Sequence, residues 1–239
     1  LETYALKVNQ SHCPFNRYAK KDYALFAEDI LSAVRSAHRL GSKILVVHGD
    51  EFDFSAEAYS EKAALEFNYR LFSPAAELLD RFGMKLAFEN VFPDMNVPRY
   101  CSTPEELLTL VGKFPKETVG ICLDTGHAKV ADDKHYLENI RSYADRVIAT
   151  HMHDNYYGKD LHLFPFLGEL DLAACVKILK EAGLPDGVIN LVYCSGPAAS
   201  EVILGSKDFA GIHFTGSTGV FNSVWSNIVK NIDKYRTYP

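Results

Sequence analysis

Apolar and polar positions alternate along the chain with two different periods. Short runs rich in Val, Ile and Leu are separated by amphipathic stretches of about ten to twenty residues. This alternation is typical of βα units around a parallel sheet, because strands that are buried on both faces form continuous apolar runs. The pattern predicts strands at residues 5–10, 44–48, 85–90, 119–124, 147–153, 188–193 and 211–215. It predicts helices at residues 21–40, 60–82, 104–113, 134–145, 171–182, 198–205 and 217–234.

Residues that start and stop helices support several of these boundaries. Gly41 and Gly83 stand where helices are expected to close just before strands. Thr103, Pro104 and Glu106 together supply an N-cap, a first-turn proline and a capping glutamate. Every expected strand is followed by an expected helix, and no linker rich in Gly, Ser or Pro divides the chain. A parallel barrel and a doubly wound sheet fit this organisation equally well.

Composition narrows the class of protein. The chain has 239 residues, of which 47% are hydrophobic and 23% charged, so disorder and a coiled coil are excluded. A formal net charge of −6 argues against a surface built mainly to neutralise nucleic-acid phosphates. The 5 cysteines are widely spaced and form no CxxC motif. This spacing argues against a disulfide framework and against a structural zinc knuckle.

Targeting signals are absent from the given sequence. No apolar run reaches the ~18 residues of a spanning helix. The amino end, LETYALKVNQ, has neither a signal-peptide pattern nor an initiating Met, which leaves open that the true start is missing. We therefore expect a soluble, reduced, cytoplasmic protein without a membrane partner.

Side chains that bind metals recur at the ends of successive expected strands. They are His12, His48, Glu89, Asp124 and His151. Their spacing of roughly 27 to 41 residues is near the ~31 per βα unit of a ~250-residue barrel. A barrel gathers the carboxyl ends of its strands into one ring, so these side chains would converge on its axis.

Imidazole and carboxylate ligands suit Zn²⁺, Mn²⁺ or Fe²⁺. Asp124-x-x-His127 places an imidazole one turn beyond a carboxylate, and Asp160-x-His162 lies in the loop after the fifth expected barrel strand. Such a ring can hold two or three cations, lower the pKa of a bound water and clamp a phosphate or a diol. The sequence thus predicts a metal site at the strand ends.

Ordinary structural roles are the alternative for each residue taken alone. A histidine at a strand end is often only hydrogen-bonded, Glu89 and Asn90 could cap the following segment, and Asp124 could begin an Asx turn. His153 alternates onto the same face as His151 and is expected only to support it. Metal-type ligands at five successive strand ends favour the joint interpretation as a metal site.

The motifs QSHCPF, LVVHGD, LAFENVF, GICLDTGHA, HMHDN and LGELDL resemble those of the xylose isomerase-like TIM-barrel superfamily, which includes sugar isomerases, epimerases and endonuclease IV. The resemblance covers roughly residues 5–182 and implies a barrel that begins at the family's third strand. Resemblance to the ketose 3-epimerases implies Glu89, Asp124 and His151 as ligands, with His127 as a substrate contact. Resemblance to endonuclease IV implies a larger ligand set. That set is His12, His48, Glu89, Asp124, His127, His151, Asp160 and His162. For either set the expected cofactor is a divalent metal ion, Zn²⁺ or Mn²⁺, with Mg²⁺ as an alternative.

The last part of the chain resembles a different family. EAGLPDGVINLV, GPAASEV, DFAGIHFTGSTGVF and NIDKYRTYP are similar to aldehyde dehydrogenases, most closely pyrroline-5-carboxylate dehydrogenase. There Gly216 and Ser217 would lie near NAD, but FTGST suits a strand-to-helix turn with an N-cap equally, and we expect no NAD site. Resemblance to the ketose 3-epimerases and to endonuclease IV also implies a glutamate on the eighth strand. Residues 188–193, which should form that strand, contain no carboxylate.

The expected architecture is therefore a chimera. Residues 1–182 would form an incomplete (β/α) TIM-type barrel holding strands three to seven. Residues 183–239 would add two βα units of dehydrogenase type to the same sheet, because both pieces are right-handed parallel βα units. An open barrel edge would favour pairing with a second copy of the chain.

Three functions compete. The first is a metal-dependent isomerase or epimerase of a small sugar or sugar phosphate, with Glu89 as metal ligand and general base and with His127 holding the substrate. The second is an endonuclease IV-like phosphodiesterase acting on abasic DNA, against which the acidic charge and the lack of basic, aromatic loops argue. The third is an inactive chimeric barrel with a partial metal site.

Overall fold

The computed structural model of the chain describes residues 8–14, 23–49, 60–93, 99–186, 188, 195–212 and 217–236. These residues fall into two compact units that are separated in sequence after Val188. The first unit comprises residues 8–188, and the second comprises the described residues from 195 onward.

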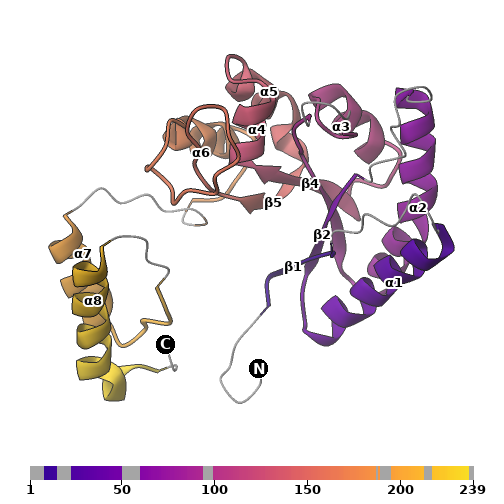
Figure 1. Ribbon diagram of the computed structural model, residues 1–239. Coiled ribbons are helices and arrows are strands. Elements are labelled where there is room, and N and C mark those ends of the chain that lie inside the picture. The colour runs from indigo at the N-terminus through magenta and orange to yellow at the C-terminus, as the bar shows by residue number, and fades with distance from the viewer. Residues whose placement is uncertain are drawn as a thin grey trace. The chain divides into compact units, whose positions relative to one another are not determined.

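A parallel sheet of five strands forms the first unit (Figure 1). The strands are β1 (Gln10–His12), β2 (Ile44–His48), β3 (Lys85–Glu89), β4 (Val119–Asp124) and β5 (Val147–His151). Their order in the sheet is β1-β2-β3-β4-β5, so each strand pairs with its neighbour in sequence. A doubly wound sheet reverses its strand order at a switch point, whereas a barrel does not. The unit is therefore a half-barrel, and the predicted barrel is confirmed to this extent.

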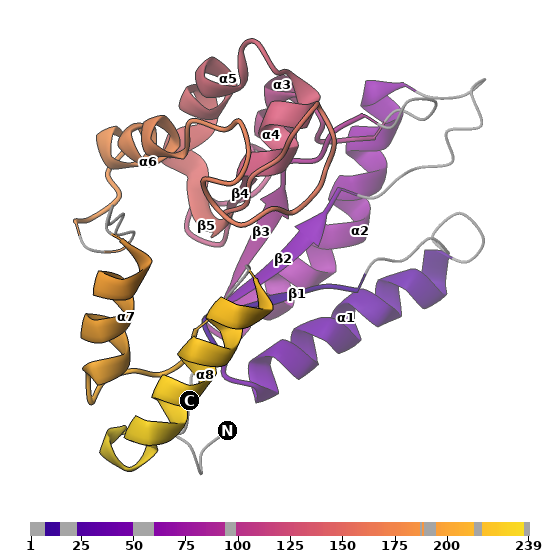
Figure 2. The same cartoon turned by 60° about the vertical axis from the view of Figure 1, so that its left-hand side comes forward.

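Helices follow the sheet around its outer side (Figure 1, Figure 2). They are α1 (Tyr23–Arg39), α2 (Glu61–Arg81), α3 (Pro104–Val111), α5 (Tyr136–Tyr143) and α6 (Leu172–Glu181). Each packs against the next, α1 on α2, α2 on α3, α3 on α5 and α5 on α6. Phe72 of α2 meets Phe88 of β3 edge to face, with ring centroids 5.1 Å apart. The main apolar core thus lies between the helices and one face of the sheet.

Local signals in the sequence define the ends of these helices. The predicted capping box is confirmed, because the Thr103 hydroxyl accepts a hydrogen bond from the Glu106 amide and Glu106 in turn caps the Thr103 amide. Gly41 and Gly83 have φ values of +76° and +64°, the left-handed conformation that glycine adopts at least cost. The chain can therefore turn sharply from α1 into β2 and from α2 into β3.

One helix was not predicted. The short helix α4 (Thr125–Ala131) begins directly after β4, well before the helix expected at 134–145. Asp124 is both the last residue of the strand and the N-cap of this helix, since its carboxylate accepts from the His127 amide at 2.7 Å. The Asx-turn alternative for Asp124 anticipated this side chain-to-backbone bond but not the helix that follows it.

The first expected strand, at residues 5–10, falls mostly outside the described residues. The described strand β1 runs from Gln10 to His12, so it ends further along the chain than predicted. The strands expected at 188–193 and 211–215 also fall largely outside the described residues. Val188, Gly211 and Ile212 are described and are not in strands. The dehydrogenase-type βα units stay a prediction.

The second unit contains α7 (Gly196–Gly205), α8 (Thr218–Asn231) and a 3₁₀ turn at Ile232–Lys234. Ser217 caps α8 through its side chain, as the turn interpretation of FTGST predicts. The core of this unit is small. It consists of Leu204, Phe209, Val224 and Ile228, with Tyr235 packed against them.

Within the described part of the chain, no helix combines the length and the apolar character needed to cross a membrane.

Candidate metal centre

Imidazole and carboxylate side chains occupy the face of the sheet opposite the helices. Successive side chains of a strand point to opposite faces, so residues two apart share a face. A lower layer of small apolar side chains lies on this face, formed by Val46, Ala87, Cys122 and Ala149. Two residues further along β2 to β5 stand His48, Glu89, Asp124 and His151. The strand register pairs His48 with Glu89 and Asp124 with His151, which brings each imidazole beside a carboxylate.

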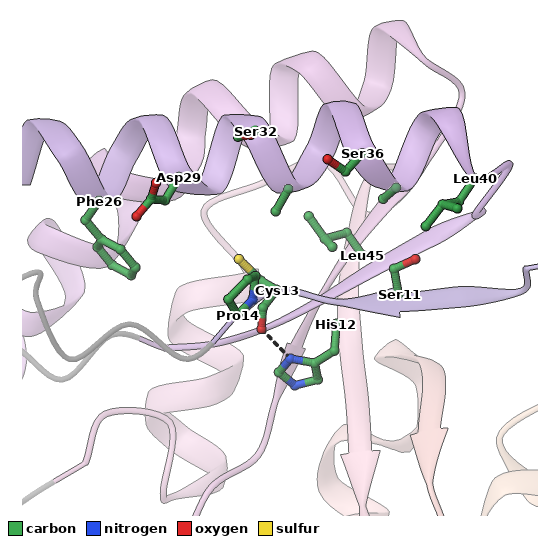
Figure 3. A pocket seen from close by; sticks show the side chains of 12 residues that line it. Ser11, His12, Cys13, Pro14, Phe26, Asp29, Ser32, Ser36, Leu40 and Leu45 are labelled. Carbon is green, nitrogen blue, oxygen red and sulfur yellow. Dashed lines mark hydrogen bonds between the residues drawn. The ribbon is translucent and has the colours of Figure 1, made fainter.

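The edge strand β1 follows the same alternation. Figure 3 shows Ser11 and Cys13 directed toward α1 and the His12 ring directed to the other side of the strand. His12 Nδ1 donates to the Cys13 carbonyl oxygen at 2.6 Å, which orients the ring and turns Nε2 toward Glu89. The neighbouring strand ends therefore all contribute to one cluster.

Glu89 is the centre of that cluster. It is only 2% exposed, and its Oε2 atom lies 3.0 Å from His12 Nε2 and 3.2 Å from His48 Nε2. Its Oε1 atom lies 3.2 Å from the Nδ1 atoms of both His127 and His151. Burial would raise the pKa of this carboxyl, but the four surrounding imidazoles hold the pKa well below its usual range. Glu89 is therefore ionised, and each of its oxygens is shared by two histidines.

Asp124 presents a buried oxygen that no protein group satisfies. Asn90 fixes the backbone at this point, because its amide group donates to the Asp124 carbonyl at 2.9 Å and accepts from the Asp124 amide at 2.7 Å. The Asp124 Oδ2 atom has no hydrogen-bond partner in the structure. It lies 3.7 Å from His127 Nδ1 and 3.8 Å from His151 Nδ1. A buried anionic oxygen without a donor is costly, and a cation placed there would remove that cost.

His127 faces two parts of the cluster with its two nitrogens. Nδ1 donates to the Asn90 carbonyl oxygen at 3.0 Å, so in the neutral ring Nε2 is the nitrogen with a free lone pair. Nε2 lies 3.5 Å from Asp160 Oδ2. Burial lowers the pKa of His127, but Glu89, Asp124 and Asp160 outweigh it and raise the pKa to about 9.

The loop between β5 and α6 completes the set. Asp160 and His162 lie in this loop, and Asp160 Oδ2 is 3.2 Å from His162 Nε2. All the side chains predicted as ligands are thereby connected through contacts of 4.0 Å or less, although they come from five strands, one helix and one loop. Their actual ligation of a metal stays a prediction.

The donor set fits divalent metal ions. Two ligands bound to one tetrahedral ion at about 2.1 Å are about 3.4 Å apart, close to the separations in this cluster. Four donor groups with shared members can be distinguished among the described residues. They are His12, His48 and Glu89; Glu89, Cys122 and His151; Glu89, Asp124 and His127; and His127, His153, Asp160 and His162. His151 Nδ1 also lies 3.8 Å from Asp124 Oδ2. Burial raises the pKa of the Cys122 thiol, so nitrogen and oxygen atoms are the available ligands.

Sequence reasoning missed residues that support the ligands. Asn90 ties the end of β3 to the end of β4, a role that the Glu89-Asn90 pair at a strand end could have suggested. Asp154 is fully buried and accepts from the amides of Gly168 and Leu170 at 2.9 Å and 3.0 Å, which folds the β5–α6 loop. Arg99 reaches to 3.4 Å from His48 Nδ1, and no local pattern indicated it.

A separate cavity of about 460 Å³ lies between β1 and α1 (Figure 3). Ser11 and Cys13 line it from the strand, and Phe26, Asp29 and Ser36 line it from the helix. The His12 ring points away from α1 toward Glu89. His12 also lines the cavity, so this residue stands between the cavity and the donor groups.

The fold is a (β/α) half-barrel with a cluster of His, Asp and Glu side chains at its strand ends, and comparison with known proteins agrees with this fold. The profile of the xylose isomerase-like TIM barrel family matches residues 1–207. The chain belongs to this family.

Two relatives in sequence differ in how much of the chain they match. The uncharacterized protein MJ1311 of Methanocaldococcus jannaschii is 31% identical over 170 residues, which cover 70% of this chain and 56% of that protein. The delta-1-pyrroline-5-carboxylate dehydrogenase of Agaricus bisporus is 47% identical over 66 residues, which cover 26% of this chain and 11% of that enzyme. The chain thus spans about half of the first relative and about a tenth of the second. The expected local similarity to the dehydrogenase is confirmed.

Solved structures share the fold. A D-tagatose 3-epimerase-like protein has a TM-score of 0.65 at 23% identity, over 97% of this chain and 81% of that one. The 3-keto-D-glucoside 4-epimerase YcjR of E. coli has a TM-score of 0.59 at 15% identity, over 83% of this chain and 77% of that one. The IOLI protein, solved with a zinc atom, has a TM-score of 0.58 at 19% identity, over 76% and 64%.

Proposed function

We propose that the chain is a divalent-metal-dependent isomerase or epimerase of a small sugar or sugar phosphate. The observation that carries the proposal is the unsatisfied Asp124 Oδ2 atom, buried beside Glu89 and His151 on the open face of a half-barrel. The epimerases among the structural neighbours add support at the level of the fold.

Glu89, Asp124 and His151 would hold the cation. When bound, it would polarise a carbonyl or hydroxyl oxygen of the sugar and so make the hydrogen on the adjacent carbon more acidic. Zn²⁺ and Mn²⁺ suit the mixture of imidazole and carboxylate, and Mg²⁺ is the third ion to test.

Glu89 is the general base in this proposal. Its Oε1 atom faces the Asp124 and His151 side, while its Oε2 atom faces His12 and His48. With a single cation on the Oε1 side, Oε2 keeps a lone pair for the proton on the sugar carbon, and His12 and His48 hold the carboxylate in place. The absence of a carboxylate from residues 188–193 favours proton movement on one face of the sugar, as in aldose–ketose isomerisation, over epimerisation with two opposed bases.

His127 is better suited to ligation than to substrate contact. Its side chain is only 7% exposed, with one nitrogen on the Asn90 carbonyl and the other directed at Asp160. A substrate hydroxyl would have to displace one of these partners. The more exposed His12 imidazole, at 29%, is the stronger candidate for holding a sugar hydroxyl.

A metal phosphodiesterase resembling endonuclease IV is the second candidate. The observation in its favour is that Glu89 lies between two donor groups and that a third follows at His127, Asp160 and His162. A carboxylate that bridges two cations cannot act as a base, whereas adjacent cations can clamp a phosphate and activate water. The number of bound ions therefore separates the two functions.

The test begins with metal content. Purified chain is stripped with a chelator, titrated with Mn²⁺ or Zn²⁺, and assayed against a panel of aldoses, ketoses and their phosphates and against a duplex with one abasic site. Sugar turnover that requires metal and is lost in Asp124→Asn supports the proposal. Nicking of the duplex without sugar turnover establishes the second candidate. Absence of metal uptake would overturn both.

A further inference from the structure

We propose that Arg99 holds the His48 ring in the tautomer that carries its proton on Nε2, and thereby prevents His48 from binding a metal ion. His48 is then a positioning residue that donates a hydrogen bond to Glu89, the general base of the proposed function. The positioning role rests on the proposed function, whereas the tautomer and the exclusion of His48 from the ligand set do not depend on it.

The guanidinium of Arg99 defines which nitrogen of His48 carries a proton. Arg99 Nη2 lies 3.4 Å from His48 Nδ1, and a guanidinium can only donate. Nδ1 must therefore be the acceptor, which leaves the single proton of the neutral ring on Nε2. That proton meets Glu89 Oε2, which lies 3.2 Å from His48 Nε2. Both ring nitrogens are thus engaged, one as an acceptor and one as a donor.

His12 on the neighbouring strand has the opposite arrangement. Its Nδ1 atom donates to the Cys13 carbonyl oxygen at 2.6 Å, which places the lone pair of the neutral ring on Nε2. A histidine that binds a metal usually donates its other ring N–H to a carbonyl oxygen or a carboxylate in this way. The Nε2 atoms of His12 and His48 both face Glu89 Oε2. Of these two rings, His12 has the orientation of a ligand and His48 that of a hydrogen-bond donor.

A metal ion cannot replace the Nε2 proton of His48 while Arg99 keeps its place. A ring that bound a cation through Nε2 and still accepted from Arg99 at Nδ1 would have lost both of its protons, whereas histidine binds metals as the neutral imidazole. The guanidinium would also repel the cation. The group of His12, His48 and Glu89 therefore lacks one of its ligands, and Glu89 Oε2 stays available as a base.

Close packing at the end of β2 brings Arg99 beside His48. A Cβ atom at Gly49 would lie 2.8 Å from Cys101 Sγ and 3.1 Å from the Tyr100 carbonyl oxygen. Glycine at this position therefore lets the chain that follows Arg99 approach the end of the strand. Tyr100 and Cys101 are both fully buried. The arginine thus extends from a backbone segment that is packed against β2.

The arginine is also supported by an aromatic ring. The Arg99 guanidinium carbon lies 5.7 Å from the centroid of the Phe92 ring, within the range of a cation–π contact. Phe92 in turn lies against the His127 ring, with the centroids 5.1 Å apart. Cys101 adopts a φ of +72°, an uncommon conformation for a residue other than glycine. Such strain persists where the surrounding structure imposes it, and it is frequent at functional sites.

The first experiment identifies the tautomer in the metal-free, full-length protein. Long-range nitrogen–proton NMR correlations of labelled histidine distinguish a ring protonated at Nε2 from one protonated at Nδ1, and His48→Asn assigns the His48 signals. We expect the Nε2–H form in the unsubstituted chain and its loss in Arg99→Met, which keeps the length of the side chain without a donor. The control Arg81→Met, at a side chain that is 75% exposed, should match the unsubstituted chain.

Arg99→Lys separates the donor from the packing. It keeps a cationic donor, so it should retain the Nε2–H form. The same loss of this form in Arg99→Lys and Arg99→Met would show that packing sets the tautomer and would overturn the proposal. An Nδ1–H form in the unsubstituted chain, or an unchanged tautomer in Arg99→Met, would overturn it as well.

The second experiment counts bound ions. Each metal-free protein is titrated with Zn²⁺, and bound zinc is measured by mass spectrometry. His48→Asn should bind as many ions as the unsubstituted chain, because His48 is not a ligand. Arg99→Met should bind one more ion, or bind its weakest ion at least tenfold more tightly, since the partner of a ligand changes metal affinity by about 10–100-fold. Adding His48→Asn to Arg99→Met should remove this gain. Loss of one ion in His48→Asn alone would overturn the proposal.

Sugar turnover separates this inference from the proposed function. If Glu89 is the base, Arg99→Met should lower kcat with little change in KM, because a displaced base affects the chemical step more than binding. A protein with the expected tautomer and ion count but without sugar turnover would contradict the proposed function and leave the assignment of His48 intact.

Discussion

The half-barrel and the described part of the C-terminal unit differ in the amount of apolar surface that they bury. In residues 8–188 a continuous parallel sheet is covered by successive helices, and side chains such as Leu86, Phe88, Ile121 and Leu123 are fully buried. The described residues of the C-terminal unit contain two helices and a turn around one small cluster. Among the described residues, the buried carboxylates, which include Glu89 and Asp124, all lie in the first unit.

The difference explains where a metal centre can form. A buried carboxylate such as Glu89 costs several kcal/mol of desolvation before its partners compensate it, on the order of the whole net stability of a domain. The half-barrel can offset this cost because its sheet and helices bury a large apolar surface. The described residues of the C-terminal unit bury too few apolar side chains to do the same.

The largest effect is expected from a substitution in the core of the half-barrel. Phe88→Ala would remove a fully buried ring that packs on Phe72, and we expect the free energy of unfolding to fall by about 3–5 kcal/mol. Urea unfolding of the metal-free protein measures this change in the free energy of unfolding. Leu204→Ala is the counterpart in the C-terminal unit and should leave zinc uptake by the half-barrel unchanged. A loss below about 1 kcal/mol for Phe88→Ala would show that this core is not what supports the site.

The next effect concerns the centre of the cluster. Glu89→Gln keeps the shape of the side chain but removes the charge that two donor groups share, so we expect Mn²⁺ affinity to fall at least about 100-fold by calorimetric titration. Glu77→Gln, at a side chain that is 73% exposed, is the control and should bind as the unsubstituted chain does. Equal affinities for the two variants would contradict a metal site at Glu89.

The third effect is a pH dependence of the metal-free chain. The pKa of His127 is raised from 6.5 to about 9, so its stabilising contribution is present below pH 6.5 and is lost as the pH rises toward 9. Glu89 has a lowered pKa, so it stabilises the folded state at neutral pH. This stabilisation is lost as the pH falls below 4.5, the ordinary pKa of a glutamate. With a chelator present, Tm should therefore decline by several degrees between pH 6.5 and 9.

Zinc provides the control for this titration. In the loaded protein a cation replaces the proton of His127, and metal binding strengthens as ligands deprotonate. The decline of Tm over the same pH range should then disappear. A metal-free protein whose Tm is constant from pH 6.5 to 9 would contradict the protonated state of His127.

The smallest effect is expected from the C-terminal unit. A chain that ends after Val188 retains every predicted ligand, since all lie in residues 8–188. We expect its zinc stoichiometry and affinity to match those of the full chain within about twofold, as is usual for sites without shared partners. Loss of zinc binding on truncation would show that residues 189–239 contribute to the half-barrel.

Much of the half-barrel could be predicted from local patterns. The strands at 44–48 and 119–124, the capping box at Thr103 and the turning glycines Gly41 and Gly83 each rest on interactions within a few residues. The ligand types at strand ends could be predicted for the same reason, because alternation and strand length are local properties. Helix α4 was missed since one residue, Asp124, had to end a strand and cap a helix at once.

The pairing of groups across the sheet could not be predicted in this way. That Asn90 braces Asp124, that Arg99 reaches His48 and that His153 lies beside Asp124 all depend on strand register and loop folding. These contacts join residues up to 51 positions apart, so no short segment of sequence encodes them.

By itself the sequence determined the order of βα units and the set of imidazoles and carboxylates at their ends, because propensity and side-chain alternation act over a few residues. Only the tertiary structure decided that Glu89 would be shared by four histidines, that Asp124 Oδ2 would be left without a donor and that His153 would meet Asp124. Those features arise when a parallel sheet curves and brings distant strand ends into one small, poorly solvated volume. Charge, burial and ligand geometry acquire their values there and not in the separate segments.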